Sequence, residues 1–230
     1  MRALSQFETL AMWENGQGLH ALDQGVLAVA TALAESPEAV ADWPLGRRNR
    51  ALAELHASAF GAQLRGWTRC KRCNTQLEFQ LDLHALLRTV EHAGDEWVTV
   101  GAHRFRLPTS RDLAAISANP GDPVRSLIDR CAGESADTWW TEAEIEEIEE
   151  RLSASDPLAE ILLHFDCPDC GASFDETLEL ASFLWAEFES RAKRTLHDVH
   201  VLARAYGWSE AEILSLTPAR RQLYVEMVGA

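Results

Sequence analysis

Two short cysteine motifs decide how this chain folds: Cys70-Lys71-Arg72-Cys73 in its first half and Cys167-Pro168-Asp169-Cys170-Gly171 in its second half. Two residues between paired cysteines let both thiolates reach one ion from a tight turn, and two such turns complete a tetrahedral site, which suits Zn²⁺. Gly171 and Asn74 follow the second cysteines, where a positive φ is often required. We therefore predict one structural zinc ion bound by Cys70, Cys73, Cys167 and Cys170.

The sequence around both motifs has the periodicity of strands. Leu77, Phe79, Leu81 and Leu83 alternate with polar residues, and residues 173–180 alternate in the same way. Each motif therefore lies in a turn flanked by strand-like sequence, as in a zinc ribbon. The pairs are separated by 93 residues (74–166), whereas the usual separation is about 15–20. We interpret the gap as a subdomain inserted between the two halves of the ribbon.

Other interpretations of the cysteines are two unrelated pairs or one redox-active pair. A redox Cys-x-x-Cys usually lies at a helix N-terminus after a strand, and neither pair begins an apolar helical pattern. A closed four-sulfur site has no open position for water, so the predicted zinc is structural rather than catalytic. Cys131 lies on an apolar helix face beside Leu127 and Ile128, and we expect it to be a buried free thiol.

Apolar periodicity predicts an α+β fold that is mainly helical. Helices are expected at residues 4–13, 21–34, 47–60, 124–131, 141–152 and 181–206, with a loop at 43–46, a hairpin at 97–107 and a strand at 159–165. Ser209 and Thr217 each begin a further short helix. The predicted organisation is a helical N-terminal region (1–61), two halves of a zinc ribbon (62–82 and 157–180), an inserted α+β subdomain (83–156) and a helical C-terminal region (181–230).

Composition excludes several classes of protein. Of the 230 residues, 47% are hydrophobic and 25% charged, as in a soluble globular chain. The sequence has no apolar run of about 18 residues for a membrane span and no secretory signal at its start. We therefore expect a cytoplasmic protein with reduced cysteines. No phosphate loop, nucleophile elbow, zinc-protease motif or dinucleotide fingerprint is present, so we predict a protein that is not an enzyme.

The formal charge of −15 is concentrated in one stretch. Residues 137–189 hold 16 acidic residues and only one basic residue, Arg151. This charge argues against binding to duplex DNA. The glutamates of residues 142–150, His164, and the pair His197 and His200 are interpreted as surface groups. A local basic cluster beside the first cysteine pair keeps open an alternative function, a zinc-ribbon nucleic-acid-binding regulator; it comprises Arg65, Arg69, Lys71 and Arg72.

Several segments resemble a family encoded in the gene clusters of contractile phage tails and phage-derived contractile injection systems. The C-terminal segments are Cys167-Pro168-x-Cys170-Gly171, Phe183-Leu184-Trp185, Leu196-His197-Asp198-Val199-His200, Tyr206-Gly207-Trp208-Ser209-Glu210-x-Glu212-Ile213-Leu214 and Arg220-Arg221-x-x-Tyr224. The earlier ones are Leu45-Gly46-Arg47-Arg48, Phe60-Gly61 and Phe105-Arg106-Leu107-Pro108-Thr109-x-x-Asp112. Members of this family are often labelled as phage-tail or baseplate hub assembly chaperones.

The resemblance implies a cytoplasmic assembly factor, chaperone or adaptor, whose partners are baseplate, hub or spike proteins. It supplies no catalytic residues. Arg and Tyr are frequent anchors at protein interfaces, and Arg220 and Tyr224 share a helix face because they are four residues apart. We predict a partner-binding surface of Trp208, Arg220, Arg221 and Tyr224, the alternative being that Tyr224 packs on the long helix. Of Trp139 and Trp140, we expect one to be buried.

Overall fold

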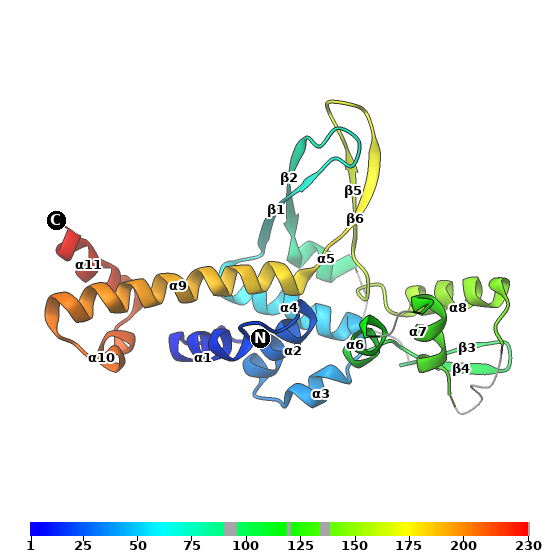
Figure 1. Cartoon of the computed structure of the whole chain (residues 1–230), viewed down its shortest axis with the longest axis horizontal. Helices are drawn as coiled ribbons and strands as arrows, with labels where there is room; N and C mark the ends of the chain where they lie inside the picture. Colours follow the sequence, from blue (N-terminus) through cyan, green and yellow to red (C-terminus); the bar gives the residue numbers. More distant parts are fainter. Residues whose placement is uncertain (90–95, 119–120, 134–138, 230) are drawn as a thin grey trace.

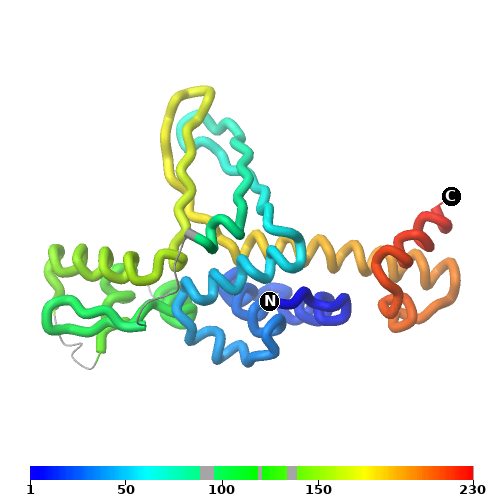
Figure 2. Tube along the Cα trace, turned by 180° about the vertical axis from the view of Figure 1, so that it is seen from behind, coloured from blue at the N-terminus to red at the C-terminus, as the bar shows by residue number. Residues whose placement is uncertain are grey.

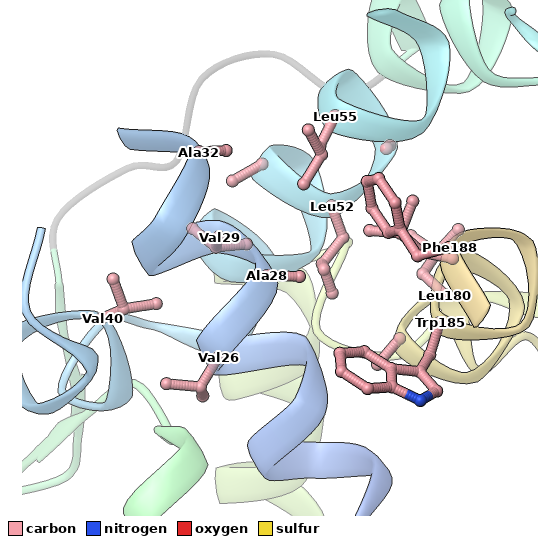
Figure 3. Close-up of a cluster of buried hydrophobic side chains, with 14 of the residues drawn as sticks. Val26, Ala28, Val29, Ala32, Val40, Leu52, Leu55, Leu180, Trp185 and Phe188 are labelled. Carbon is pink, nitrogen blue, oxygen red and sulfur yellow. The ribbon is translucent and has the colours of Figure 1, made fainter. Parts of the chain in front are cut away.

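A central helical body is built around one buried helix. The computed structural model describes residues 1–89, 96–118, 121–133 and 139–229. Helix α2 (Ala21–Leu33) lies between α4 (Leu45–Phe60) and α9 (Leu180–Tyr206), and α1 (Gln6–Gly16) and α3 (Pro37–Ala41) complete the body (Figure 1). Val29 of α2, Leu55 of α4 and Phe188 of α9 are fully buried in this core (Figure 3). The apolar residues 3–4 positions apart that predict these helices are therefore their packing faces.

Close approach of α2 and α1 to α9 depends on two glycines. A Cβ on Gly25 would lie 2.8 Å from the Cβ of Ala181, and a Cβ on Gly16 would lie 2.1 Å from the ring of Trp185. Any side chain at these positions would push α9 away from the body.

Two antiparallel hairpins project together from this body. Strand β1 (Gln63–Arg69) pairs with β2 (Gln76–Asp82), and β5 (Leu162–Asp166) pairs with β6 (Ser173–Thr177). The two hairpins lie side by side although residues 83–161 separate them in the sequence (Figures 1 and 2). Helix α5 (Leu83–Thr89) follows β2 and packs on α4. Strand β5 begins at Leu162, three residues later than the sequence predicts.

The segment between the hairpins forms its own core. Hairpin β3–β4 (Trp97–Val100 and His103–Arg106) packs with α7 (Pro123–Cys131) and α8 (Glu142–Ser155), while α6 (Ser110–Ser117) lies toward the body. Phe105, Ile128 and Ile148 are at the centre of this second core. The chain is thus mainly helical with small strand pairs, as predicted.

Helix α9 carries the C-terminal elements away from the body. Its 27 residues span about 40 Å. Helices α10 (Glu210–Ser215) and α11 (Pro218–Gly229) fold back onto its far end (Figure 2). None of the helices in the described part of the chain combines the length and apolar character that a membrane crossing needs. Helix α4 begins at Leu45, inside the predicted loop 43–46, because the carbonyl of Pro108 accepts a hydrogen bond from the Leu45 N–H.

Candidate metal centre

The turns at the ends of the two hairpins bring all four motif cysteines together. Cys70 and Cys73 lie in the β1–β2 turn, and Cys167 and Cys170 lie in the β5–β6 turn. Each turn is at the end of its hairpin farthest from the helical body (Figure 1). The two halves of the site are therefore positioned by strand pairs whose bases are anchored in the main core through Leu64 and Leu178.

The two turns have the same backbone geometry. The N–H of Cys70 donates to the carbonyl of Thr75, and the N–H of Cys167 donates to Ala172, both at 2.9 Å. The residues after the second cysteines, Asn74 and Gly171, have φ of 63° and 67°. The positive φ expected from the sequence is confirmed at both positions, and glycine and asparagine tolerate it better than other residues.

The four sulfur atoms have the spacing of a metal-binding cluster. They all lie within 4.8 Å of one another; the Cys70 and Cys170 Sγ atoms are 3.6 Å apart, and those of Cys73 and Cys167 are 3.5 Å apart. A disulfide would require about 2.05 Å, whereas tetrahedral thiolates around one ion at about 2.3 Å would be about 3.8 Å apart. The cluster is thus compatible with a metal site.

Electrostatics favour a cation at this cluster. Hydrogen bonds from the backbone N–H groups of Cys73 and Arg72 lower the pKa of Cys70, and hydrogen bonding to Thr75 lowers the pKa of Cys73 to about 6. The Ala172 N–H lowers the pKa of Cys170, but burial and the neighbouring sulfurs outweigh it and raise that pKa to about 12. Four thiolates therefore need a positive charge between them to ionise together.

Side chains also connect the two turns across the cluster. The Thr75 hydroxyl donates a hydrogen bond of 2.7 Å to the Asp169 carboxylate. Lys71 lies 3.2 Å from the Glu176 carboxylate and donates to the carbonyl of Asp175. Lys71 of the predicted basic cluster is thus paired within the ribbon, whereas Arg65 and Arg69 lie on the exposed face of β1.

Cys131 is separate from the cluster. It is fully buried at the end of α7, and burial raises the pKa of its thiol to about 12. The predicted buried free thiol is confirmed, because a thiol with this pKa stays protonated and inert at neutral pH.

The other groups considered as ligands do not gather into a site within the described ranges. Apart from the four cysteines, no set of three or more histidine, cysteine or carboxylate side chains converges there. His197 and His200 are exposed on α9. His164 lies 2.7 Å from Asp175, which raises the pKa of His164 through their hydrogen bond.

The predicted partner-binding residues divide into two groups. Trp208 and Tyr224 meet edge to face at 5.0 Å, and Tyr206 stacks on Trp208 at 4.7 Å. Arg220 covers the Tyr224 ring at 5.7 Å. We call Tyr206, Trp208 and Tyr224 the C-terminal aromatic cluster.

Arg221 does not belong to that surface, which corrects the prediction. Its side chain is only 7% exposed, and its Nε lies 2.9 Å from the Asp198 carboxylate on α9. A second hydrogen bond runs from Nη1 to Gln6 of α1. Arg221 therefore faces inward and holds α11 against α9 and α1.

The two adjacent tryptophans also separate. Trp140 is 4% exposed and donates from its indole nitrogen to Asp129, whereas Trp139 is 87% exposed. The expectation that one of the two is buried is confirmed.

A buried polar junction between the body and the inserted segment was missed by the sequence analysis. Gly46 donates its N–H to Asp156 at 2.8 Å, and Arg48 donates to the Ser110 hydroxyl at 3.0 Å. Asp112 is 1% exposed and receives ion pairs from Arg106 and Arg130. The available signal was the capping-box pattern of Thr109 and Asp112, which form a capping box at α6.

No protein-family model, curated protein or solved structure matches this chain.

Proposed function

We propose that the protein is a non-enzymatic, cytoplasmic assembly factor, a chaperone or adaptor for the baseplate or hub of a contractile phage tail or contractile injection system. The observation that carries the proposal is the position of the segment with the most specific resemblance, residues 206–214. Its Tyr206 and Trp208 form the C-terminal aromatic cluster with Tyr224 at the end of α9, away from the main core. Beside it, Leu223 and Met227 are 56% and 64% exposed, as in a docking surface.

The metal we propose at the cysteine cluster is one structural Zn²⁺. The four sulfurs fit its preferred donor set, and four protein ligands leave no position for a reacting water. The ion would neutralise the thiolates and join the two hairpins. We propose that this zinc ion fixes the shape of the ribbon.

Metal analysis tests the zinc assignment. Purified protein should contain about one zinc per chain, and Cys73→Ser or Cys170→Ser should lose it. Cys131→Ser is the matched control and should retain the metal. Protein without zinc, or zinc lost in Cys131→Ser, would contradict the assignment.

Co-purification tests the proposed partner. The tagged chain is expressed with the other proteins of a contractile tail cluster and recovered with its partners. The double variant Arg220→Glu with Tyr224→Ala should keep the fold, because Arg220 is exposed and Tyr224 is only half-buried, and should lose the baseplate or hub component. Arg88→Glu, an exposed site on α5, is the control. Equal recovery of the partner by both variants would reject this docking surface.

One observation favours the second candidate, a nucleic-acid-binding regulator. Trp67 is 58% exposed between Arg65 and Arg69, and the Arg69 guanidinium lies 5.6 Å from its ring. Aromatic and basic side chains on one face are typical of nucleic-acid-binding surfaces. The net charge of −15 opposes tight binding to duplex DNA, so we expect none at physiological salt. A submicromolar complex whose affinity falls steeply with salt would instead favour the regulator.

A further inference from the structure

Helices α1, α9 and α11 enclose a surface pocket of about 840 Å³. This volume is in the range of ligand-binding sites. Gln6 of α1, Arg191 and Arg194 of α9, and Arg221 of α11 are part of its wall. The pocket lies at neither the cysteine cluster nor the C-terminal aromatic cluster.

The wall of this pocket is basic although the whole chain is strongly acidic. Its charged residues are Arg191, Lys193, Arg194 and Arg221, with one carboxylate, Asp198, and Lys193 is also paired with Glu189 at 2.8 Å. Burial lowers the pKa of Arg191, and repulsion from Arg194 lowers it further. Positive charge is thus crowded here without full neutralisation, in a protein whose net charge is −15.

Two guanidinium groups in the wall are held in place and keep N–H donors available. Arg221, 6% exposed, uses Nε for Asp198 and Nη1 for Gln6, while its Nη2 has no hydrogen bond to any described residue. Arg191 donates from Nη2 to the carbonyl of Ala59 at 2.7 Å and stacks on Phe60. Its Nε and Nη1 make no hydrogen bond within the described ranges. Arg191 is half-buried, and none of these unused nitrogens is a fully buried unpaired atom, so they stay accessible from the pocket and can donate to an anion.

The chemistry and spacing of these groups indicate carboxylates. Guanidinium groups form strong charge-assisted hydrogen bonds with carboxylates, and Arg221 has its Nη2 left for such a bond. Arg221 is fixed on Asp198, two helical turns beyond Arg191, a rise of about 10 Å along α9. Three residues of extended peptide also span about 10 Å. Asp198 beside Arg221 disfavours a more highly charged phosphate.

We propose that the pocket between α1, α9 and α11 binds an acidic, extended peptide segment of a partner protein, whose carboxylates pair with Arg221 and Arg191. Arg194, which is exposed in the wall of the pocket, adds attraction at its edge. This site is independent of the contractile-tail assignment, because the recognition depends only on the peptide's charge and spacing.

Fluorescence polarisation with the full-length protein tests the proposal. The probe is a fluorescein-labelled peptide of Asp-Gly-Gly repeats, and an Asn-Gly-Gly peptide of the same length is its control. Arg194→Glu reverses a charge at the pocket without touching the core. Arg204→Glu makes the same change on α9 outside the pocket, so the two variants have the same net charge. Inorganic phosphate is titrated as a separate ligand.

We expect the aspartate peptide to bind and the asparagine peptide not to bind. Arg194→Glu should weaken binding about tenfold, and Arg204→Glu by less than about twofold, since a charge in contact counts for more than a distant screened one. Failure of the aspartate peptide to bind at low salt, or equal loss in the two variants, would overturn the proposal. Phosphate that binds more tightly than the peptide would overturn the assignment to a peptide.

Discussion

At the residue scale, single buried polar groups join parts of the chain that are distant in sequence. Asp112 accepts hydrogen bonds from Arg106 on β4, from Arg130 on α7 and from Thr109 at the start of α6. One carboxylate therefore fixes three elements of the inserted segment. Burial alone would raise its pKa, but the hydrogen bonds from Arg106 and Thr109 outweigh this and lower the pKa to about 2.

This lowered pKa gives Asp112 a defined pH dependence. Its folded pKa is below the unfolded value of 3.8, so its stabilisation is fully present above about pH 4 and is lost as the pH falls toward 2. Asp112→Asn should cost about 3–5 kcal/mol at neutral pH, because two guanidinium groups lose their partner.

Thermal unfolding of the wild type and of Asp112→Asn, measured from pH 7 to pH 2, tests this pH dependence. Acid also releases a thiolate-bound metal from both proteins. The informative quantity is therefore the difference between their melting temperatures at each pH. That difference should shrink below pH 4. A constant difference would contradict the role assigned to Asp112.

Gly46 is the second residue whose identity is set by a distant contact. A Cβ at this position would lie 1.7 Å from the Asp156 Oδ1 atom. Gly46→Ala should therefore displace the junction between the body and the inserted segment and destabilise the protein by about 1–3 kcal/mol. Urea unfolding followed by tryptophan fluorescence measures this cost. Gly121→Ala is the matched control, because its new Cβ would come no closer than 3.8 Å to the Ser126 hydroxyl.

At the scale of elements, local sequence patterns predicted most helices and strands. Ser209 with Glu212 and Thr141 with Glu144 form capping boxes at the predicted helix starts. Alternation at residues 77–83 located β2, because a strand with one packed face has a period of two. The cysteine cluster was equally predictable, because the two-residue spacing within each pair is local and a closed tetrahedral site needs both pairs.

Features that depend on which helices and strands pack together could not be predicted from the sequence. Arg220 and Arg221 are neighbours of the same type, yet Arg220 is exposed over the Tyr224 ring and Arg221 is buried on Asp198. The sequence does not reveal which face of α11 contacts α9. In the same way, nothing local to Leu45 shows that Pro108 will accept its N–H and allow α4 to begin there.

The different contacts of Arg220 and Arg221 predict different effects of their substitution on the packing of α11 against α9. Arg221→Ala leaves Asp198 partly buried without its partner, which should cost about 3–5 kcal/mol. Arg220→Ala removes an exposed contact and should cost less than about 1 kcal/mol. Hydrogen exchange should show loss of protection in α11 for the first variant only. Equal protection in both would mean that the ion pair does not hold the helix.

At the scale of the whole molecule, the cysteine cluster is remote from the packed core. The four cysteines lie at the ends of the projecting hairpins, whereas the main core is formed by the helices of the body and is joined by hairpin residues as far along β2 as Phe79 (Figure 1). The two turns contact each other through sulfur atoms and through Thr75 and Asp169. A metal ion would therefore stabilise the ribbon locally, and the helical body has its own source of stability in apolar burial.

Removal of the metal should consequently separate ribbon unfolding from unfolding of the body. Chelation leaves up to four thiolates whose mutual repulsion is no longer neutralised, so the hairpin ends should open. The far-ultraviolet circular dichroism signal of the helices should change little. Hydrogen exchange should increase in residues 66–79 and 163–175 and remain slow around Val29, Leu55 and Phe188, which are buried in the main core. Cys131→Ser treated with chelator should behave like the wild type, because its thiol is buried at the end of α7, apart from the cysteine cluster. Loss of helical signal together with the hairpins would show instead that the ribbon and the body form one cooperative unit.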